Sequence, residues 1–168
     1  MKRVVRSLVI YLLPLLGLYA NAALADAGPA VGAEAPKLIA RTLDDQLYLL
    51  SHDKGRPKVM NFFWVQCVPC KAEMPELAKL ELAYPKVKFV SVHASTESPE
   101  EVAKFIHGLS GAPSNIVVTQ AAARDAFNVK GLPHTIVMDQ DNIVQANLVG
   151  YTPKNMAALK KMLDKLAQ

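Results

Sequence analysis

Residues 59–71 have the sequence VMNFFWVQCVPCK and contain both cysteines of the chain, Cys67 and Cys70. The apolar run at 58–65 is continuous and rich in aromatic residues, which is typical of a buried central strand. A segment compatible with a helix follows at 71–84. A strand that delivers a C-x-x-C pair to the start of a helix is the arrangement that thiol–disulfide chemistry requires. This stretch therefore predicts a redox-active pair.

The two thiols are expected in different surroundings. Cys67 is placed at the exposed start of the helix, where unpaired backbone amides and the helix dipole favour a thiolate, so it is the predicted attacking thiol. Cys70 is placed one turn inside the helix and is the predicted buried resolving thiol. The two residues between them close only a small loop, which would stabilise the fold little. A redox or metal-binding role is therefore favoured over a structural disulfide.

The first 25 residues have the pattern of a secretory signal peptide. A positively charged start is followed by the apolar stretch 8–20 and by a small-x-small cleavage signal that ends at Ala25. An uncleaved membrane anchor is the alternative, but the apolar stretch is short for a span of about 20 residues and contains Pro14 and Gly17. We expect cleavage after Ala25 and a periplasmic protein. Contact with a membrane is expected only if cleavage fails, in which case the chain would be anchored to the inner membrane and face the periplasm.

The composition after this segment is that of one ordinary globular domain. The chain has 168 residues, of which 51% are hydrophobic and 20% charged. Three of the 19 basic residues and none of the 15 acidic ones lie in residues 1–25, so the remainder has a formal net charge of +1 and gives no indication of nucleic acid as a partner. Residues 26–35, rich in Ala, Gly and Pro, are predicted to be a flexible tether, and residues 36–168 a single domain.

The hydrophobic pattern predicts strands that alternate with helices. The expected elements are short strands within 38–50, a strand at 58–65, a helix at 71–84, a strand at 87–93, a helix at 98–110, a strand at 115–119, a short helix at 121–127, a hairpin of strands at 134–138 and 143–149, and a closing helix from 152 to about 167. The alternating part implies parallel strands, and the hairpin adds an antiparallel edge.

Two motifs together carry a resemblance to a known family. One is WVQCVPCK at 64–71, and the other is GLPHT at 131–135, immediately before a strand and hairpin. The segments VGAEAP at 31–36 and CKAEMP at 70–75 match the same family. The chain resembles thioredoxin-fold proteins, and more closely the exported TlpA/ResA-like thiol–disulfide oxidoreductases, over essentially all of the sequence from residue 31. The resemblance implies an α/β thioredoxin fold, with a central mixed β-sheet flanked by helices and a short N-terminal strand extension.

The resemblance also implies roles for residues outside the cysteine pair. Pro133 is expected to be the cis-proline that faces the disulfide, and the backbone of Leu132 to pair with an extended substrate. The surface around Cys67 is expected to include Trp64 and Gln66, although Gln66 stands where the family usually has an aromatic residue. Substrate choice is expected to depend on the surface formed by Trp64, Gln66, Glu73, Leu132 and His134.

The residues between the cysteines bear on the direction of electron transfer. Val68 adds no positive charge and Pro69 lacks an amide donor, so a strongly depressed thiol pKa is not expected. We therefore expect a reductant of protein disulfides, in cytochrome c maturation or a related assembly, that an upstream membrane electron donor keeps reduced. Its only redox group would be the Cys67–Cys70 disulfide, without another cofactor.

Glu73 is the candidate for proton transfer. In thioredoxins, a buried acid on the preceding strand helps to move the proton of the resolving thiol, but the matching position here is Asn61, which cannot titrate. In the TlpA/ResA-like group, an acid at the position of Glu73 resembles the substitute. Glu73 is therefore expected to assist deprotonation of Cys70 or to help select the substrate. The alternative is a carboxylate that merely favours the helix start.

His134 opens a different function for the same two thiols. It directly follows Pro133, where the family usually has Thr, and two thiolates with an imidazole suit Cu(I) or zinc. A copper-binding chaperone or copper-site thiol reductase that uses Cys67, Cys70 and His134 is thus the alternative function. The simpler interpretation of His134 is a polar residue at the start of a strand. A non-catalytic binding module that uses the sheet edge near Leu132 is a third hypothesis.

Overall fold

Strands and helices alternate along the chain in the predicted order. The computed structural model describes residues 27–167, so the predicted signal peptide lies outside the described residues. The elements are β1 (Ile39–Thr42), β2 (Leu47–Leu49), the 3-10 turn η1 (Leu50–His52), β3 (Lys58–Phe63), α1 (Val68–Ala83), β4 (Lys88–Ala94), α2 (Pro99–His107), β5 (Asn115–Thr119), α3 (Ala122–Ala126), β6 (His134–Met138), β7 (Val144–Val149) and α4 (Pro153–Leu166). No helix formed by residues 27–167 is long and apolar enough to cross a membrane.

The seven strands form one mixed sheet in the order β2-β1-β5-β4-β3-β6-β7. Strands β3, β4 and β5 are parallel, whereas β6 and β7 add an antiparallel hairpin beside β3. Strands β1 and β2 extend the other side of the sheet in antiparallel pairing. The predicted fold class, a mixed sheet flanked by helices with a short N-terminal strand extension, is therefore confirmed.

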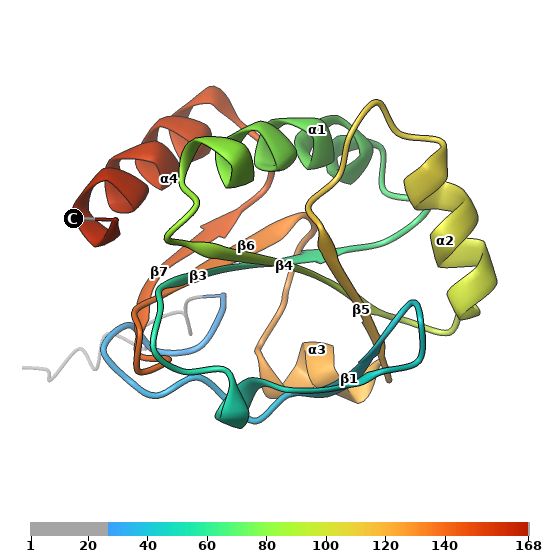
Figure 1. Ribbon diagram of the computed structural model, residues 1–168, viewed down its shortest axis with the longest axis horizontal. Helices are drawn as coiled ribbons and strands as arrows, with labels where there is room; N and C mark the ends of the chain where they lie inside the picture. Colours follow the sequence, from blue (N-terminus) through green and yellow to red (C-terminus); the bar gives the residue numbers. More distant parts are fainter. Residues whose placement is uncertain (1–26, 168) are drawn as a thin grey trace, which may run out of the picture.

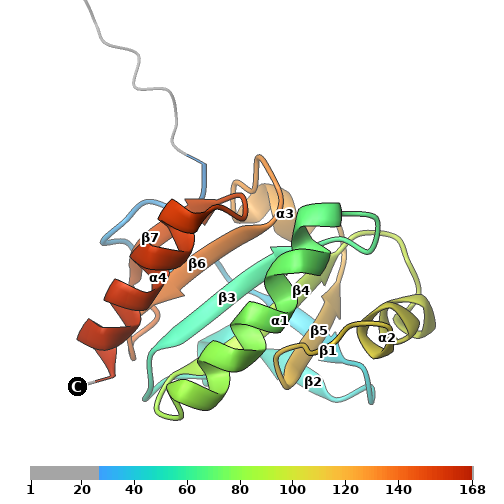
Figure 2. The ribbon, with the colours of Figure 1, turned by 90° about the horizontal axis from the view of Figure 1, so that it is seen from above.

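Strand β3 lies at the centre, and all six of its side chains are buried. Helices α1 and α4 cover one face, α2 continues the layer beyond α1, and α3 lies on the other face (Figures 1 and 2). On the face of α1 and α4 the core includes Val59, Leu77, Leu80, Phe89, Val137, Leu159 and Leu163. On the opposite face it includes Leu50, Met60, Phe62, Val90, Val92, Phe127 and Ile136.

Helix boundaries follow local capping chemistry. Helix α2 begins with a capping box: the Ser98 hydroxyl accepts from the Glu101 N–H, and the Glu101 carboxylate accepts from the Ser98 N–H. Helix α1 begins at Val68, earlier than the predicted residue 71, because Cys67 serves as its N-cap and a proline is tolerated in the first turn. The same helix continues through Pro75.

The described part of the predicted tether, residues 27–35, makes hydrogen bonds to the domain. The Asn147 amide donates to the Pro29 carbonyl oxygen at 2.8 Å. The Gly32 N–H donates to the Val144 carbonyl oxygen, also at 2.8 Å. The physical reason is that β7 is an edge strand, whose outer backbone groups need partners that the segment supplies.

Two leucines on α1 provide a matched test of this packing. Leu77 is 0% exposed in the α1–α4 core, whereas Leu82 is 84% exposed. We expect Leu77→Ala to lower the free energy of unfolding by about 2–5 kcal/mol, because it leaves a cavity. We expect Leu82→Ala, the same substitution on the same helix, to change it by less than about 0.5 kcal/mol. Urea unfolding of the oxidised protein measures both, and equal losses would contradict the described packing.

Candidate active site

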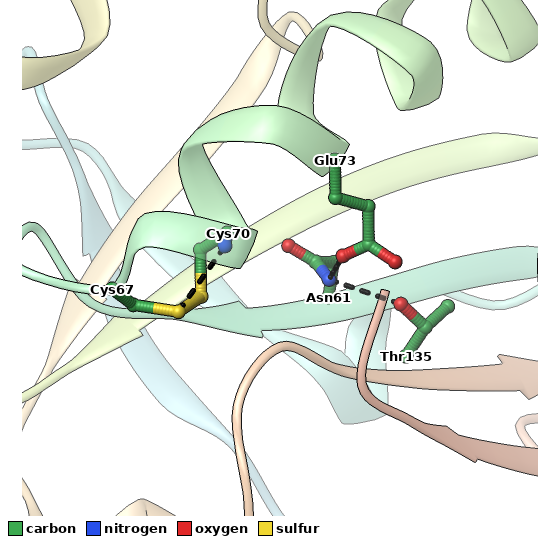
Figure 3. Close-up of a disulfide and its surroundings, with 5 residues drawn as sticks. All are labelled: Asn61, Cys67, Cys70, Glu73 and Thr135. Carbon is green, nitrogen blue, oxygen red and sulfur yellow. Dashed lines mark hydrogen bonds between the residues drawn. A yellow bond between two sulfur atoms is a disulfide. The ribbon is translucent and has the colours of Figure 1, made fainter. Parts of the chain in front are cut away.

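The cysteine pair lies at the start of α1, just after the connection from β3 (Figure 3). Cys67 and Cys70 form a disulfide with a Cα–Cα distance of 5.2 Å. As the N-cap of α1, Cys67 accepts a hydrogen bond at its sulfur from the Cys70 N–H at 3.2 Å. Cys67 is half-buried, whereas Cys70 is only 1% exposed. This asymmetry is the one expected for an attacking and a resolving thiol.

Asn61 on β3 connects α1 to β6 (Figure 3). Its side-chain amide donates to Glu73 Oε2 at 2.8 Å and to Thr135 Oγ1 at 3.0 Å. Its own Oδ1 is buried and has no hydrogen-bond partner among the described residues. The role of Thr135 was not predicted, yet the pairing of Asn61 with Thr135 across β3 and β6 brings the two together.

Glu73 is a buried acid rather than an exposed carboxylate at the helix start. Its side chain points from α1 toward Asn61, and the residue is 3% exposed. Burial raises the pKa of Glu73 from 4.5 to about 7, and the hydrogen bond from Asn61 opposes this rise only in part. A carboxyl with that pKa can both hold and release a proton near neutral pH.

The loop before β6 closes the site from the other side. The Leu132–Pro133 peptide bond is cis, as the resemblance implies. Leu132 packs against the cluster that contains Cys70 and Phe63. The Pro133 carbonyl oxygen accepts from the Gly150 N–H at 2.8 Å, which holds the loop against the end of β7. Substrate pairing at Leu132 stays a prediction.

The segment between β3 and Cys67 contacts Glu97, a residue that the sequence analysis did not identify. Trp64 is 38% exposed and Gln66 is exposed as well. The Trp64 indole N–H donates to a carboxylate oxygen of Glu97, a residue in the connection between β4 and α2. Nothing in the sequence pattern around Glu97 marks it, because it lies in an irregular connection between two elements.

His134 is not brought together with the cysteines. Thr135 points toward Asn61 and α1, so the alternation of a strand directs its neighbour His134 to the opposite face of the sheet. There it is fully buried. Burial lowers the pKa of its imidazole, and the interaction with the Asn147 side chain opposes this lowering only in part. Within residues 27–167 no group of three His, Cys, Asp or Glu side chains could hold a metal ion. The alternative set Cys67, Cys70 and His134 is therefore not assembled.

Comparison with known proteins places this site in a family. The Redoxin family matches residues 30–165, which is most of the chain. The chain belongs to the Redoxin family. Two relatives are the thioredoxin-like protein YneN of Bacillus subtilis, 28% identical over 88% of both chains, and the thiol-disulfide oxidoreductase ResA of Geobacillus thermodenitrificans, 29% identical over 91% of both.

A solved structure has the same fold. A protein described as the thiol:disulfide interchange protein DsbE from Chlorobium tepidum superimposes with a TM-score of 0.75 at 19% identity, covering 83% of this chain and 99% of that one. The thioredoxin fold is thereby confirmed, and so is the resemblance to ResA-like proteins. The chain is a thioredoxin-like thiol–disulfide oxidoreductase, as the sequence predicted.

The raised pKa of Glu73 has a consequence for stability. The pKa of Glu73 rises from 4.5 to about 7 on folding, so the folded state binds the carboxyl proton more tightly than the unfolded state does. The stability that this proton contributes is fully present below about pH 4.5 and is lost as the pH rises to about 7. We expect the free energy of unfolding of the wild type, relative to Glu73→Gln, to fall by about 3 kcal/mol across this range. Urea unfolding of both disulfide-intact proteins at pH 4.5, 6 and 7.5 measures the difference. A difference that stays constant with pH would contradict the raised pKa.

Proposed function

We propose that the protein is an exported reductant of protein disulfides in which Cys67 attacks and Cys70 resolves. The observation that carries this proposal is the asymmetry of the pair: Cys67 is half-buried at the start of α1, and Cys70 is buried within it. A substrate disulfide can approach the first sulfur only. The signal-peptide pattern in residues 1–25 supports export, with the periplasm as the compartment.

The reaction moves two electrons from the enzyme to its substrate. The Cys67 thiolate attacks one sulfur of the substrate disulfide, whose bond breaks as a mixed disulfide forms, and the leaving substrate thiolate takes up a proton. The Cys70 thiolate then attacks the Cys67 sulfur, and the second substrate thiolate leaves. The substrate ends as a dithiol and the enzyme as the Cys67–Cys70 disulfide, the form seen in the structure. An upstream membrane electron donor returns two electrons to the enzyme.

The local chemistry supports a reductant. The helix start stabilises a Cys67 thiolate, and the Cys70 N–H already points at that sulfur. Further stabilisation of the Cys67 thiolate is small. Neither Val68 nor Pro69 carries a positive charge, and Pro69 has no backbone N–H to donate. A thiolate of moderate stability gives up its electrons more readily than one of very low pKa.

Glu73 serves as the proton acceptor for Cys70 in this proposal. Its pKa of about 7 leaves a substantial fraction ionised at neutral pH, so it can take the proton that Cys70 must lose before it attacks. Figure 3 shows its carboxyl directed at Asn61, so the proton would pass from Cys70 to Glu73 through a water molecule beside Asn61. Asn61 itself has an unpartnered oxygen available for such a water.

The proposed substrates are the oxidised Cys-x-x-Cys-His segments at which haem is attached in cytochrome c maturation, or similar thiols in a related assembly. An extended segment of this kind would pair with the backbone at Leu132, beside cis-Pro133, and lie against Trp64 and Gln66. The disulfide is the only redox group in this proposal, and no further cofactor is invoked.

Trapping tests the assignment of the two thiols. In Cys70→Ser the resolving step is blocked, so we expect substrate to stay covalently attached to Cys67. The measurement is a non-reducing gel after reaction of the reduced variant with an oxidised Cys-x-x-Cys-His peptide. Cys67→Ser is the matched control, and it should trap nothing. Stronger trapping by Cys67→Ser than by Cys70→Ser would reverse the two roles.

The direction of transfer has a separate test. We expect the potential of the Cys67–Cys70 couple to lie nearer the roughly −270 mV of thioredoxin than the roughly −120 mV of the strongly oxidising proteins of this fold. Equilibration in dithiothreitol buffers, with the dithiol fraction measured by alkylation, gives the value. A potential near −120 mV would overturn the reductant assignment while leaving the thiol roles intact.

A further inference from the structure

Glu97 is a partly buried, charged residue beside the active site that the proposed reaction does not use. It lies between the end of β4 and the start of α2, and its side chain is only 11% exposed. Burial by itself would raise its pKa, but hydrogen bonds from Ser95, from its own backbone, from Gln66 and from Trp64 lower the pKa of Glu97 to about 2. The side chain is therefore an anion with several donors directed at it.

Two of these donors belong to the short segment that leads from β3 to the attacking cysteine. The Trp64 indole N–H donates to Glu97 Oε1, and the Gln66 side chain contributes to the lowered pKa of the same carboxylate. The Trp64 carbonyl oxygen in turn accepts from the Cys67 N–H at 3.1 Å. The Glu97 carboxylate thus binds the Trp64 side chain, and the backbone of Trp64 is bonded directly to that of Cys67.

The other carboxylate oxygen, Oε2, faces His93. His93, near the end of β4, is 0% exposed, and its Nε2 lies 3.3 Å from Glu97 Oε2. The His93 ring packs on Phe63 at 5.4 Å between centroids, and Phe63 belongs to the buried cluster that contains Cys70. The charged groups that act on His93 are Glu97 and the more distant Glu101. The network therefore joins β4, the end of β3 and the approach to the disulfide.

We propose that Glu97 is a positioning residue that fixes the Trp64 indole as a wall of the site at which Cys67 meets protein substrates. The indole is partly exposed, so its outer surface is available to a partner, while its N–H is committed to Glu97. Without that acceptor, the indole is free to rotate, and segment 64–66 loses its contact with a charged group. The role in substrate binding rests on the proposed function, whereas the hold on Trp64 does not.

This role separates large substrates from small ones. A small disulfide reaches the Cys67 sulfur without touching the indole, so its reaction depends on the thiolate alone. A peptide disulfide also contacts the indole beside Cys67. If the indole is mobile, each binding event must order it, at a cost in conformational entropy. Loss of Glu97 should therefore slow reaction with peptides selectively.

The single tryptophan of the chain makes a direct test possible, because all indole fluorescence comes from Trp64. The variants are Glu97→Ala, which removes the acceptor, and Glu97→Gln, which removes the charge but keeps an amide oxygen for the indole N–H. The matched control is Glu100→Gln, which removes an exposed charge three residues further along. Two measurements are made on each reduced protein: acrylamide quenching of Trp64, and the rate constants for an oxidised Cys-x-x-Cys-His peptide and for the small disulfide 5,5′-dithiobis(2-nitrobenzoate).

In Glu97→Ala we expect quenching to increase at least twofold and the peptide rate constant to fall about tenfold, with the small-disulfide rate constant changed less than twofold. Glu97→Gln should fall between this variant and the wild type, and Glu100→Gln should match the wild type. Unchanged quenching and an unchanged ratio of the two rate constants would overturn the proposal, as would an equal fall of both. If Glu97→Ala does not fold, Glu97→Gln decides by the same criteria.

The outcome also separates this inference from the proposed function. A wild type that does not reduce the peptide, together with increased quenching in Glu97→Ala, supports the hold on Trp64 and contradicts the proposed substrate class. Normal peptide reduction by the wild type, together with unchanged quenching in Glu97→Ala, supports the proposed substrate class and contradicts the hold on Trp64.

Discussion

The active site depends on one constraint, the burial of β3 between two hydrogen-bonded neighbours. All six side chains of β3 are buried, and the strand is paired with β4 on one side and β6 on the other. A shift of register by one residue would exchange its two faces, so the strand can occupy only one position. That position fixes the point at which the chain leaves the sheet, and with it the start of α1 and Cys67. It also aims Asn61 at the α1 face, where Glu73 and Thr135 bind it.

Two carboxyl groups near the disulfide show how surroundings assign different properties to the same chemical group. Glu73 has one side-chain donor in an apolar setting, and its pKa is raised to about 7. Glu97 is surrounded by donors, and its pKa is lowered to about 2. The first can exchange a proton at neutral pH, whereas the second remains a fixed charge. One belongs to proton movement at Cys70 and the other to the placement of the surface beside Cys67.

Much of this arrangement could be predicted from the sequence because it follows from local patterns. The apolar run of β3, the Ser98 capping box and the spacing of Cys67 and Cys70 each act within a few residues. The misses concern contacts between distant segments. The face to which His134 points depends on strand register, and the Glu97–Trp64 bond on how an irregular connection folds back. The binding of residues 27–35 to β7 likewise depends on a strand edge that composition does not reveal.

The bound segment 27–35 also covers part of an exposed strand edge. An unpaired strand edge is a template onto which another chain can add, which is a common route to aggregation. Here the first part of the β7 edge is covered by the chain itself, through the contacts of Gly32 and Ala33 with Val144. A shortened chain that began at residue 36 would keep the disulfide, the cis-proline loop and the core, yet it would uncover that edge. The segment that composition marks as a mere spacer thus acts as a built-in guard against strand-to-strand association.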